Sequence, residues 1–209
     1  MGSLRVGLAL VSLGLAPLVG LAQTAAAENP PVVNAIWVEK EIEFTYMAFT
    51  TFYSCDGLRD KVRWVLKEIG ARPGFKVTVG GCMNTGPDVL PHVRLKAAMP
   101  RAATPELLDE LAKEASKREL VARSSGKSAD VNEATAQFAA RTRQIEFTDD
   151  PLNHIEAGDC ELVEQLRDQV FVPLGARVID DRMSCTPKQL NLHGVRLTIQ
   201  VLEPVPENK

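Results

Sequence analysis

The stretch Ile42-Glu43-Phe44-Thr45 in the first half of the chain returns as Ile145-Glu146-Phe147-Thr148 in the second half. The match continues downstream, in the same order and at nearly the same spacing. Each half has a cysteine, then Gly-Ala-Arg, then a second cysteine and then Val-Arg-Leu. In the first half these are Cys55, residues 70–72, Cys82 and residues 93–95. In the second half they are Cys160, residues 175–177, Cys185 and residues 195–197. Four matches in one order predict a duplicated unit.

Each repeat has the pattern of a strand, a helix and two further strands. In the first, the β-forming stretch 36–53 precedes a helix that Ser54 caps and Gly70 ends, with strands at 75–80 and 92–99. The second has strands at 143–148, 176–183 and 195–202 and a helix at 160–172. Residues at helical spacing predict the buried faces: Leu58, Val62, Val65, Leu66 and Ile69, then Leu162, Leu166 and Val170.

A Thr-Pro start and apolar spacing predict another helix over 104–118, and 119–123 is predicted as a short edge strand. The first repeat then reads βαββαβ, an order typical of an α+β, ferredoxin-like split βαβ sandwich. The βαββ second repeat is expected to pair with the first. The predicted organisation is a signal segment at 1–27, repeat 1 at 28–123, a linker at 124–130 and repeat 2 at 131–209. Residues 131–140 favour a short helix or, alternatively, extend the next strand.

The N-terminus has the pattern of an export signal. Arg5 precedes an apolar stretch over 6–22, and Ala25-Ala26-Ala27 supplies a cleavage pattern before Glu28. The sequence therefore predicts a periplasmic or secreted protein with no stable membrane insertion after cleavage. Loss of Arg5 changes the formal net charge from −3 to −4, and no basic block is present. A nucleic-acid partner is therefore not expected, because neutralising phosphates requires clustered Lys and Arg.

The cysteines predict one disulfide in each repeat. In a right-handed β-α-β crossover, the start of the helix and the end of the next strand lie at the same end of the sheet. Cys55 and Cys160 begin helices, and Cys82 and Cys185 follow strands. The pairs Cys55–Cys82 and Cys160–Cys185 are therefore expected. Redox catalysis is the alternative, because a helix N-terminus lowers a thiol pKa, but no Cys-x-x-Cys pair is present.

Metal binding is a second alternative, and no resident cofactor is expected. His92 and His193 precede the two Val-Arg-Leu strands and could join reduced cysteines, although the spacing is not that of a zinc finger. His154 lies in the polar run from Asp149 to Asp159, which could offer oxygen ligands to a cation. A solvated loop is the simpler interpretation of that run, because it lacks the alternation of a calcium loop.

Aromatic residues concentrate in one repeat only. Phe44, Tyr46, Phe49, Phe52 and Tyr53 fall on both faces of the predicted strand, and the matching stretch of the second repeat is polar. The pattern indicates either a strand buried on both faces or an exposed surface for a ligand or partner. The candidate binding surface is Tyr46, Phe49, Phe52 and Tyr53.

No serine-hydrolase, metalloprotease, phosphate-loop or nucleotide motif occurs in the sequence. The leading hypothesis is an exported, non-enzymatic module that binds an envelope protein or a small ligand. The alternative is an envelope metal-binding protein or enzyme that uses His92, His193 or the Asp149–Asp159 loop.

Overall fold

The computed structural model describes residues 30–81, 90–124, 136–150, 154–190 and 192–206. The predicted signal segment at 1–27, residues 125–130 of the predicted linker, residues 131–135 of the predicted short helix and Cys82 lie outside these ranges, so the predictions about them stay predictions. Among the described residues, no helix is long and apolar enough to cross a membrane.

The described chain is α+β, with one six-stranded antiparallel sheet of order β2-β3-β1-β4-β6-β5. The first half contains β1 (Val32–Thr45), α1 (Cys55–Glu68), β2 (Lys76–Gly80), β3 (His92–Ala102) and α2 (Pro105–Ser124). The second half contains β4 (Phe138–Thr148), η2 (Ala157–Asp159), α3 (Cys160–Leu166), η3 (Arg167–Phe171), α4 (Val172–Leu174), β5 (Arg177–Asp181) and β6 (Arg196–Pro204).

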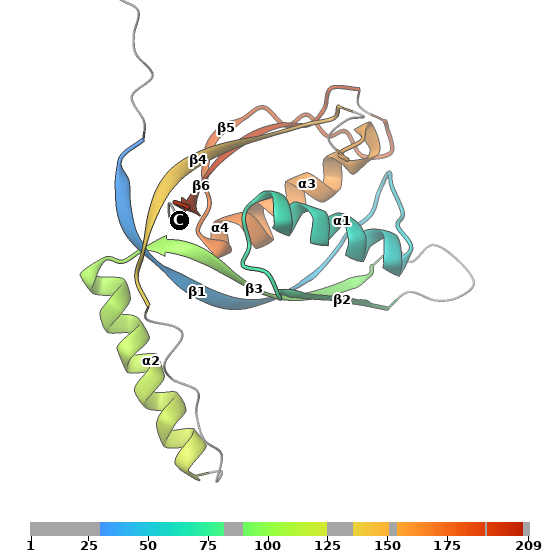
Figure 1. The fold of residues 1–209 in the computed structure, drawn as a ribbon. Coiled ribbons are helices and arrows are strands. Elements are labelled where there is room, and N and C mark those ends of the chain that lie inside the picture. Colours follow the sequence, from blue (N-terminus) through green and yellow to red (C-terminus); the bar gives the residue numbers. More distant parts are fainter. Residues whose placement is uncertain (1–29, 82–89, 125–135, 151–153, 191, 207–209) are drawn as a thin grey trace, which may run out of the picture.

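The sheet joins the two halves and encloses their helices. β1 and β4 pair only over 32–35 and 138–141, and beyond this short ladder the strands separate. The sheet curls so that β1–β3–β2 and β4–β6–β5 lie on either side of α1 and α3 (Figure 1). One cluster of buried side chains contains residues from both halves, so the helices share a single core.

The two predicted helical stripes are confirmed. Ser54 caps α1 by accepting a hydrogen bond from the Gly57 amide at 3.1 Å, and all five predicted core residues of this helix are buried. Leu162, Leu166 and Val170 are fully buried in the second half. There the helix runs from α3 through a π-helical stretch, η3, into α4. Pro173 lacks an amide donor, which accounts for the irregular turn before it.

Residues from each half contact the end of the other half's helix. The Arg143 guanidinium on β4 donates to the backbone oxygen of Glu68, the last residue of α1. The Arg101 side chain on β3 lies directly against Gly175, where α4 ends with a φ of +94°. A cation at a helix C-terminus is favourable because the backbone carbonyls there carry partial negative charge. These contacts fix each helix against the opposite half of the sheet.

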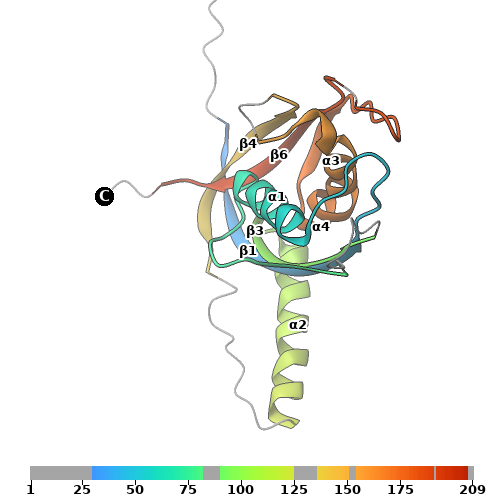
Figure 2. The same ribbon diagram turned by 90° about the vertical axis from the view of Figure 1, so that its right-hand side faces the viewer.

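The predicted edge strand at 119–123 is wrong, because these residues belong to α2. Glu, Leu, Ala and Arg are good helix formers, and Glu119 pairs with Arg123 one turn later. α2 also projects away from the sheet and does not cover it as a ferredoxin-like helix would (Figure 2). The short helix predicted for 131–140 is also wrong for residues 138–140, because they belong to β4. The alternative, in which this stretch extends the next strand, is confirmed for the same residues.

The predicted Cys160–Cys185 disulfide is confirmed, with a Cα–Cα distance of 5.6 Å. It joins the start of α3 to the segment that follows β5, as the crossover argument requires. The pair Cys55–Cys82 remains a prediction. The Cys55 Sγ lies 3.5 Å from the backbone oxygen of Val79, near the end of β2, and this placement agrees with it.

Candidate functional site

Residues 46–54, which we call the aromatic loop, connect β1 to α1. The predicted strand therefore stops at Thr45, and its aromatic residues divide between interior and solvent. Tyr46 is fully buried, whereas Phe49 and Phe52 are 52% and 44% exposed. The rings of Tyr46 and Tyr53 contact each other at 5.5 Å between centroids. Tyr46 thus belongs to the base of the loop, and only part of the predicted surface faces solvent.

The two tyrosine hydroxyls tie the loop to the interior. Tyr46 donates to the backbone oxygen of Thr51 at 2.9 Å, and Tyr53 donates to the carboxylate of Asp159. Burial, followed by the nearby negative charges of Glu161 and Asp159, raises the pKa of Tyr46 well above its usual range. Burial and then Asp159 do the same to the pKa of Tyr53. Both phenols therefore stay neutral donors at physiological pH.

Glu161, in the first turn of α3, holds the centre of the aromatic loop. One carboxylate oxygen accepts the backbone amides of Phe49 and Thr50, each at 3.0 Å. The other accepts the Thr50 hydroxyl at 2.8 Å. Glu161 is only 5% exposed, so these bonds compensate a buried carboxylate. The positive end of the α3 dipole also favours its charge.

Gln165, one turn further along α3, holds the start of the same loop. Its amide oxygen accepts the Met47 N–H and its amide nitrogen donates to the Met47 carbonyl, both at 2.9 Å. The side chain thus satisfies both backbone groups of one residue, as a neighbouring strand would. Glu161 and Gln165 together fix the backbone from Met47 to Thr50.

Asp159 completes the attachment on the side nearest α1. This carboxylate is 2% exposed and accepts the Lys61 ammonium at 2.6 Å and the Glu156 amide at 2.7 Å. Lys61 also donates to the backbone oxygen of His154 at 2.8 Å. Asp159 directly precedes the first residue of α3, and two of its partners, Lys61 and Tyr53, come from the first half of the chain.

Exposed apolar side chains gather around this attached loop. Met47 is 51% exposed and Leu190, in the segment before β6, is 70% exposed. Lys188 donates its amide to the Thr50 hydroxyl at 2.8 Å, which places this segment against the aromatic loop. We call Met47, Phe49, Phe52 and Leu190 the apolar tip.

The predicted histidine ligands have separate partners. His92 lies on the outer face of the sheet, 3.5 Å from a Glu43 carboxylate oxygen, and His193 is 3.8 Å from Asp149. The ring of His154 packs on Trp64. Within the described ranges, no three His, Cys, Asp or Glu side chains gather closely enough to hold a metal ion. The metal alternative therefore gains no support from these residues.

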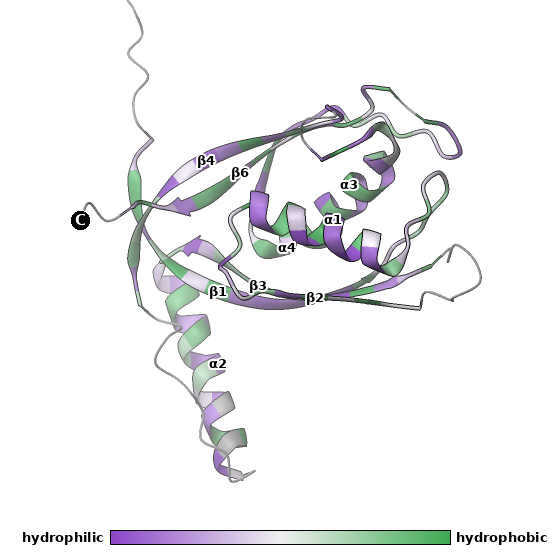
Figure 3. Cartoon of the chain, turned by 45° about the vertical axis from the view of Figure 1, so that its right-hand side comes forward, coloured by the Kyte–Doolittle hydropathy of each residue, from purple (hydrophilic) through white to green (hydrophobic). Residues whose placement is uncertain are grey.

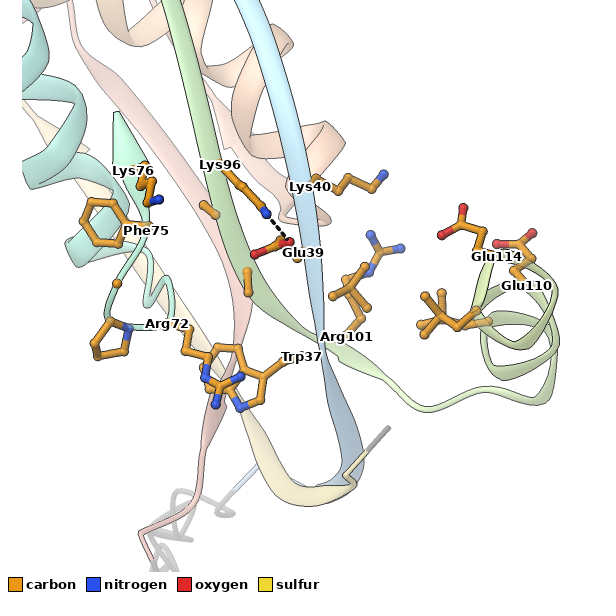
Figure 4. A pocket seen from close by; sticks show the side chains of 17 residues that line it. Trp37, Glu39, Lys40, Arg72, Phe75, Lys76, Lys96, Arg101, Glu110 and Glu114 are labelled. Carbon is orange, nitrogen blue, oxygen red and sulfur yellow. Dashed lines mark ion pairs between the residues drawn. The ribbon is translucent and has the colours of Figure 1, made fainter. Parts of the chain in front are cut away.

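A groove of about 1090 Å³ lies between α2 and the outer face of β1 and β3. Its floor holds Trp37, with the Arg72 guanidinium 5.8 Å from the ring centroid, and an ion pair between Lys96 and Glu39 at 2.9 Å. Lys40 and Arg101 line the strand side, and Glu110 and Glu114 line the helix side (Figure 4). Charges of both signs face this open space, so the groove favours no single class of ion.

Comparison with protein-family models, with curated proteins and with solved structures finds no match to this chain. The functional argument therefore rests on the geometry of the aromatic loop.

Proposed function

We propose that this chain is an exported, non-enzymatic module that binds an envelope protein through the apolar tip. The observation that carries the proposal is the attachment of an exposed aromatic loop by two buried carboxylates, Asp159 and Glu161. Phe49 and Phe52 face solvent although the backbone beneath them is held in place.

A fixed backbone favours binding because less conformational entropy is lost when the partner docks. Aromatic side chains at the centre of an interface contribute a large share of its binding energy. Phenyl groups about half exposed on a loop suit a protein surface better than a small ligand, which usually requires an enclosing pocket. A protein partner is therefore preferred over a small ligand.

The test is affinity capture from envelope extract with residues 28–209 as bait, followed by titration of the captured protein. Changing Phe49 and Phe52 to Ser should weaken binding by about thirtyfold or more, as for an interface hot spot. Val172→Ser is the matched control, because Val172 is 54% exposed outside the loop. Equal loss in both variants, or no loss in the Phe49 and Phe52 variant, would count against the proposal.

Export to the periplasm or the exterior is part of the same proposal. The Cys160–Cys185 disulfide is compatible with an oxidising compartment. The test is N-terminal sequencing of protein from a periplasmic or secreted fraction. We expect the mature chain to start near Glu28, and a chain that keeps residues 6–22 would contradict this.

We also propose that the scaffold arose by duplication of a βαββ unit. The elements of the two halves follow the same order along the chain: β1, α1, β2 and β3 in the first, and β4, α3, β5 and β6 in the second. If β4, β5 and β6 correspond to β1, β2 and β3, the strand order of the sheet is the same when it is followed from either edge. An experimental structure in which the two units superpose, α1 on α3, tests this origin. Units that superpose only after a change of strand order would contradict it.

A further inference from the structure

The two sides of the groove between α2 and the sheet carry opposite charges. The strand side holds one carboxylate, Glu39, which is paired with Lys96 at 2.9 Å, and several cations. These cations are Lys40, Arg72, Lys76, Lys96 and Arg101. The charged residues of the helix side are two acids, Glu110 and Glu114, and Figure 4 shows them across the space from Lys40 and Arg101. A small ion would meet both signs, whereas the two sides attract each other.

One face of α2 is complementary to the surface that it faces. Leu107, Glu110, Leu111 and Glu114 follow one another at intervals of three, one and three positions, so they share one side of the helix. Hydrophobic and hydrophilic residues alternate along α2, as Figure 3 shows. Both leucines are partly buried, and Trp37 lines the same groove from the sheet. Apolar and acidic groups of the helix therefore face an apolar and basic surface.

A short connection joins β3 to α2. Ala103 is held by the sheet, because its amide donates to the backbone oxygen of Asn34 at 2.9 Å. Thr104 is held by the helix, because its hydroxyl and its carbonyl accept the amides of Leu107 and Leu108 at 3.3 and 3.0 Å. Hinges are a few residues at the end of an element that absorb changes of φ and ψ. The link from Ala103 to Thr104 has the position of such a hinge, and α2 projects from the sheet beyond it (Figures 1 and 2).

We propose that α2 is a lid that swings about this hinge and closes on the groove. In the closed state Leu107 and Leu111 pack on Trp37, and Glu110 pairs with Lys40. Burial of the apolar groups and pairing of the opposite charges favour closure, whereas hydration of the same charges favours the open state. Each contribution is small for a partly exposed contact, so the two states differ little in free energy and both are populated. The lid thereby covers or exposes the outer face of the sheet.

The first test is zero-length cross-linking of oxidised residues 28–209 with a carbodiimide, followed by peptide mapping. The reagent joins a carboxylate to an amine only where the two groups touch. We expect a link from Lys40 to Glu110 or Glu114 at 20 mM salt, and at least about threefold less of it at 500 mM salt, because salt screens partly exposed charges. Asp109 is the matched control carboxylate, since it is exposed and lies outside the groove lining. Linkage of Lys40 to Asp109 as often as to Glu110, or to neither, would contradict closure.

The second test measures the distance between spin labels at Thr78→Cys in β2 and Lys117→Cys in α2 by double electron–electron resonance. Lys117 lies about 18 Å along the helix from Pro105, so a swing of about 30° moves its label by about 9 Å. The labelled chain should give two distances, the shorter from the closed state. Glu110→Lys and Lys40→Glu should each lower the ratio of closed to open chains by about three- to tenfold, and the double variant should restore it.

Asp109→Lys is the matched control for the charge reversals and should leave both populations unchanged. Far-UV circular dichroism checks that α2 remains helical in every variant. A single distance that neither salt nor either reversal alters, or a double variant that does not recover the closed population, would overturn the proposal.

Discussion

Replacing Glu161 by Ala should release the aromatic loop from α3. The change removes the acceptor for two backbone amides and one hydroxyl, at 3.0, 3.0 and 2.8 Å. Hydrogen bonds to a charged group contribute about 1.5–3 kcal/mol each, and buried donors without partners cost a similar amount. The Thr50 hydroxyl can turn to water, so the two amides dominate. For two such bonds we expect the free energy of unfolding to fall by about 3–6 kcal/mol.

The assay is urea denaturation combined with amide hydrogen exchange at Phe49 and Thr50. Glu161→Gln should cost less, about 1–2 kcal/mol, because its amide oxygen can still accept on one side. Glu164→Ala is the control on the same helix, since its carboxylate makes no hydrogen bond within the described ranges. If Glu161→Ala matched this control and the two amides exchanged no faster, the role assigned to Glu161 would be refuted.

Three further predictions concern the same region. Asp159→Ala should lower stability by about 3–5 kcal/mol, measured by urea denaturation, because it leaves the Lys61 ammonium without its buried partner. The raised pKa of Tyr53 means that the folded state keeps its proton longer than the unfolded state. Stability should therefore fall as pH rises above about 10, and Tyr53→Phe should flatten this fall in thermal melts. Changing Cys160 and Cys185 to Ser removes a cross-link between positions 25 residues apart and should lower the free energy of unfolding by about 3–4 kcal/mol in denaturant titrations.

The helices and the second-half disulfide could be predicted because their signals are local and repeated. Leu58, Val62 and Leu66 fall on one face at helical spacing, and burial of that face is what makes α1 stable. The Cys160–Cys185 pair followed from the handedness of a β-α-β crossover, which hardly varies between proteins.

The attachment of the aromatic loop could not be predicted, because it depends on contacts between residues more than one hundred positions apart. In the sequence, Glu161 is an ordinary acidic residue in the first turn of a helix and Gln165 an ordinary helix former. Their partners are backbone amides at Phe49, Thr50 and Met47, and backbone groups carry no sequence signal. Likewise, α2 had the composition of a helix, but composition does not say which surface a helix packs on.

In each half a connection joins the first strand to the helix. The two connections differ in composition, and the one in the second half contacts the one in the first. In the first half this connection is aromatic and presents Phe49 and Phe52. In the second half it is polar and supplies Asp159, which binds Tyr53 and Lys61 of the first half. The polar run is therefore part of the support for the aromatic one. If the apolar tip binds a partner, Asp159→Ala should weaken that binding although Asp159 is buried and cannot touch the partner. Titration of the captured protein against this variant, compared with Glu164→Ala, measures how far binding depends on a fixed loop.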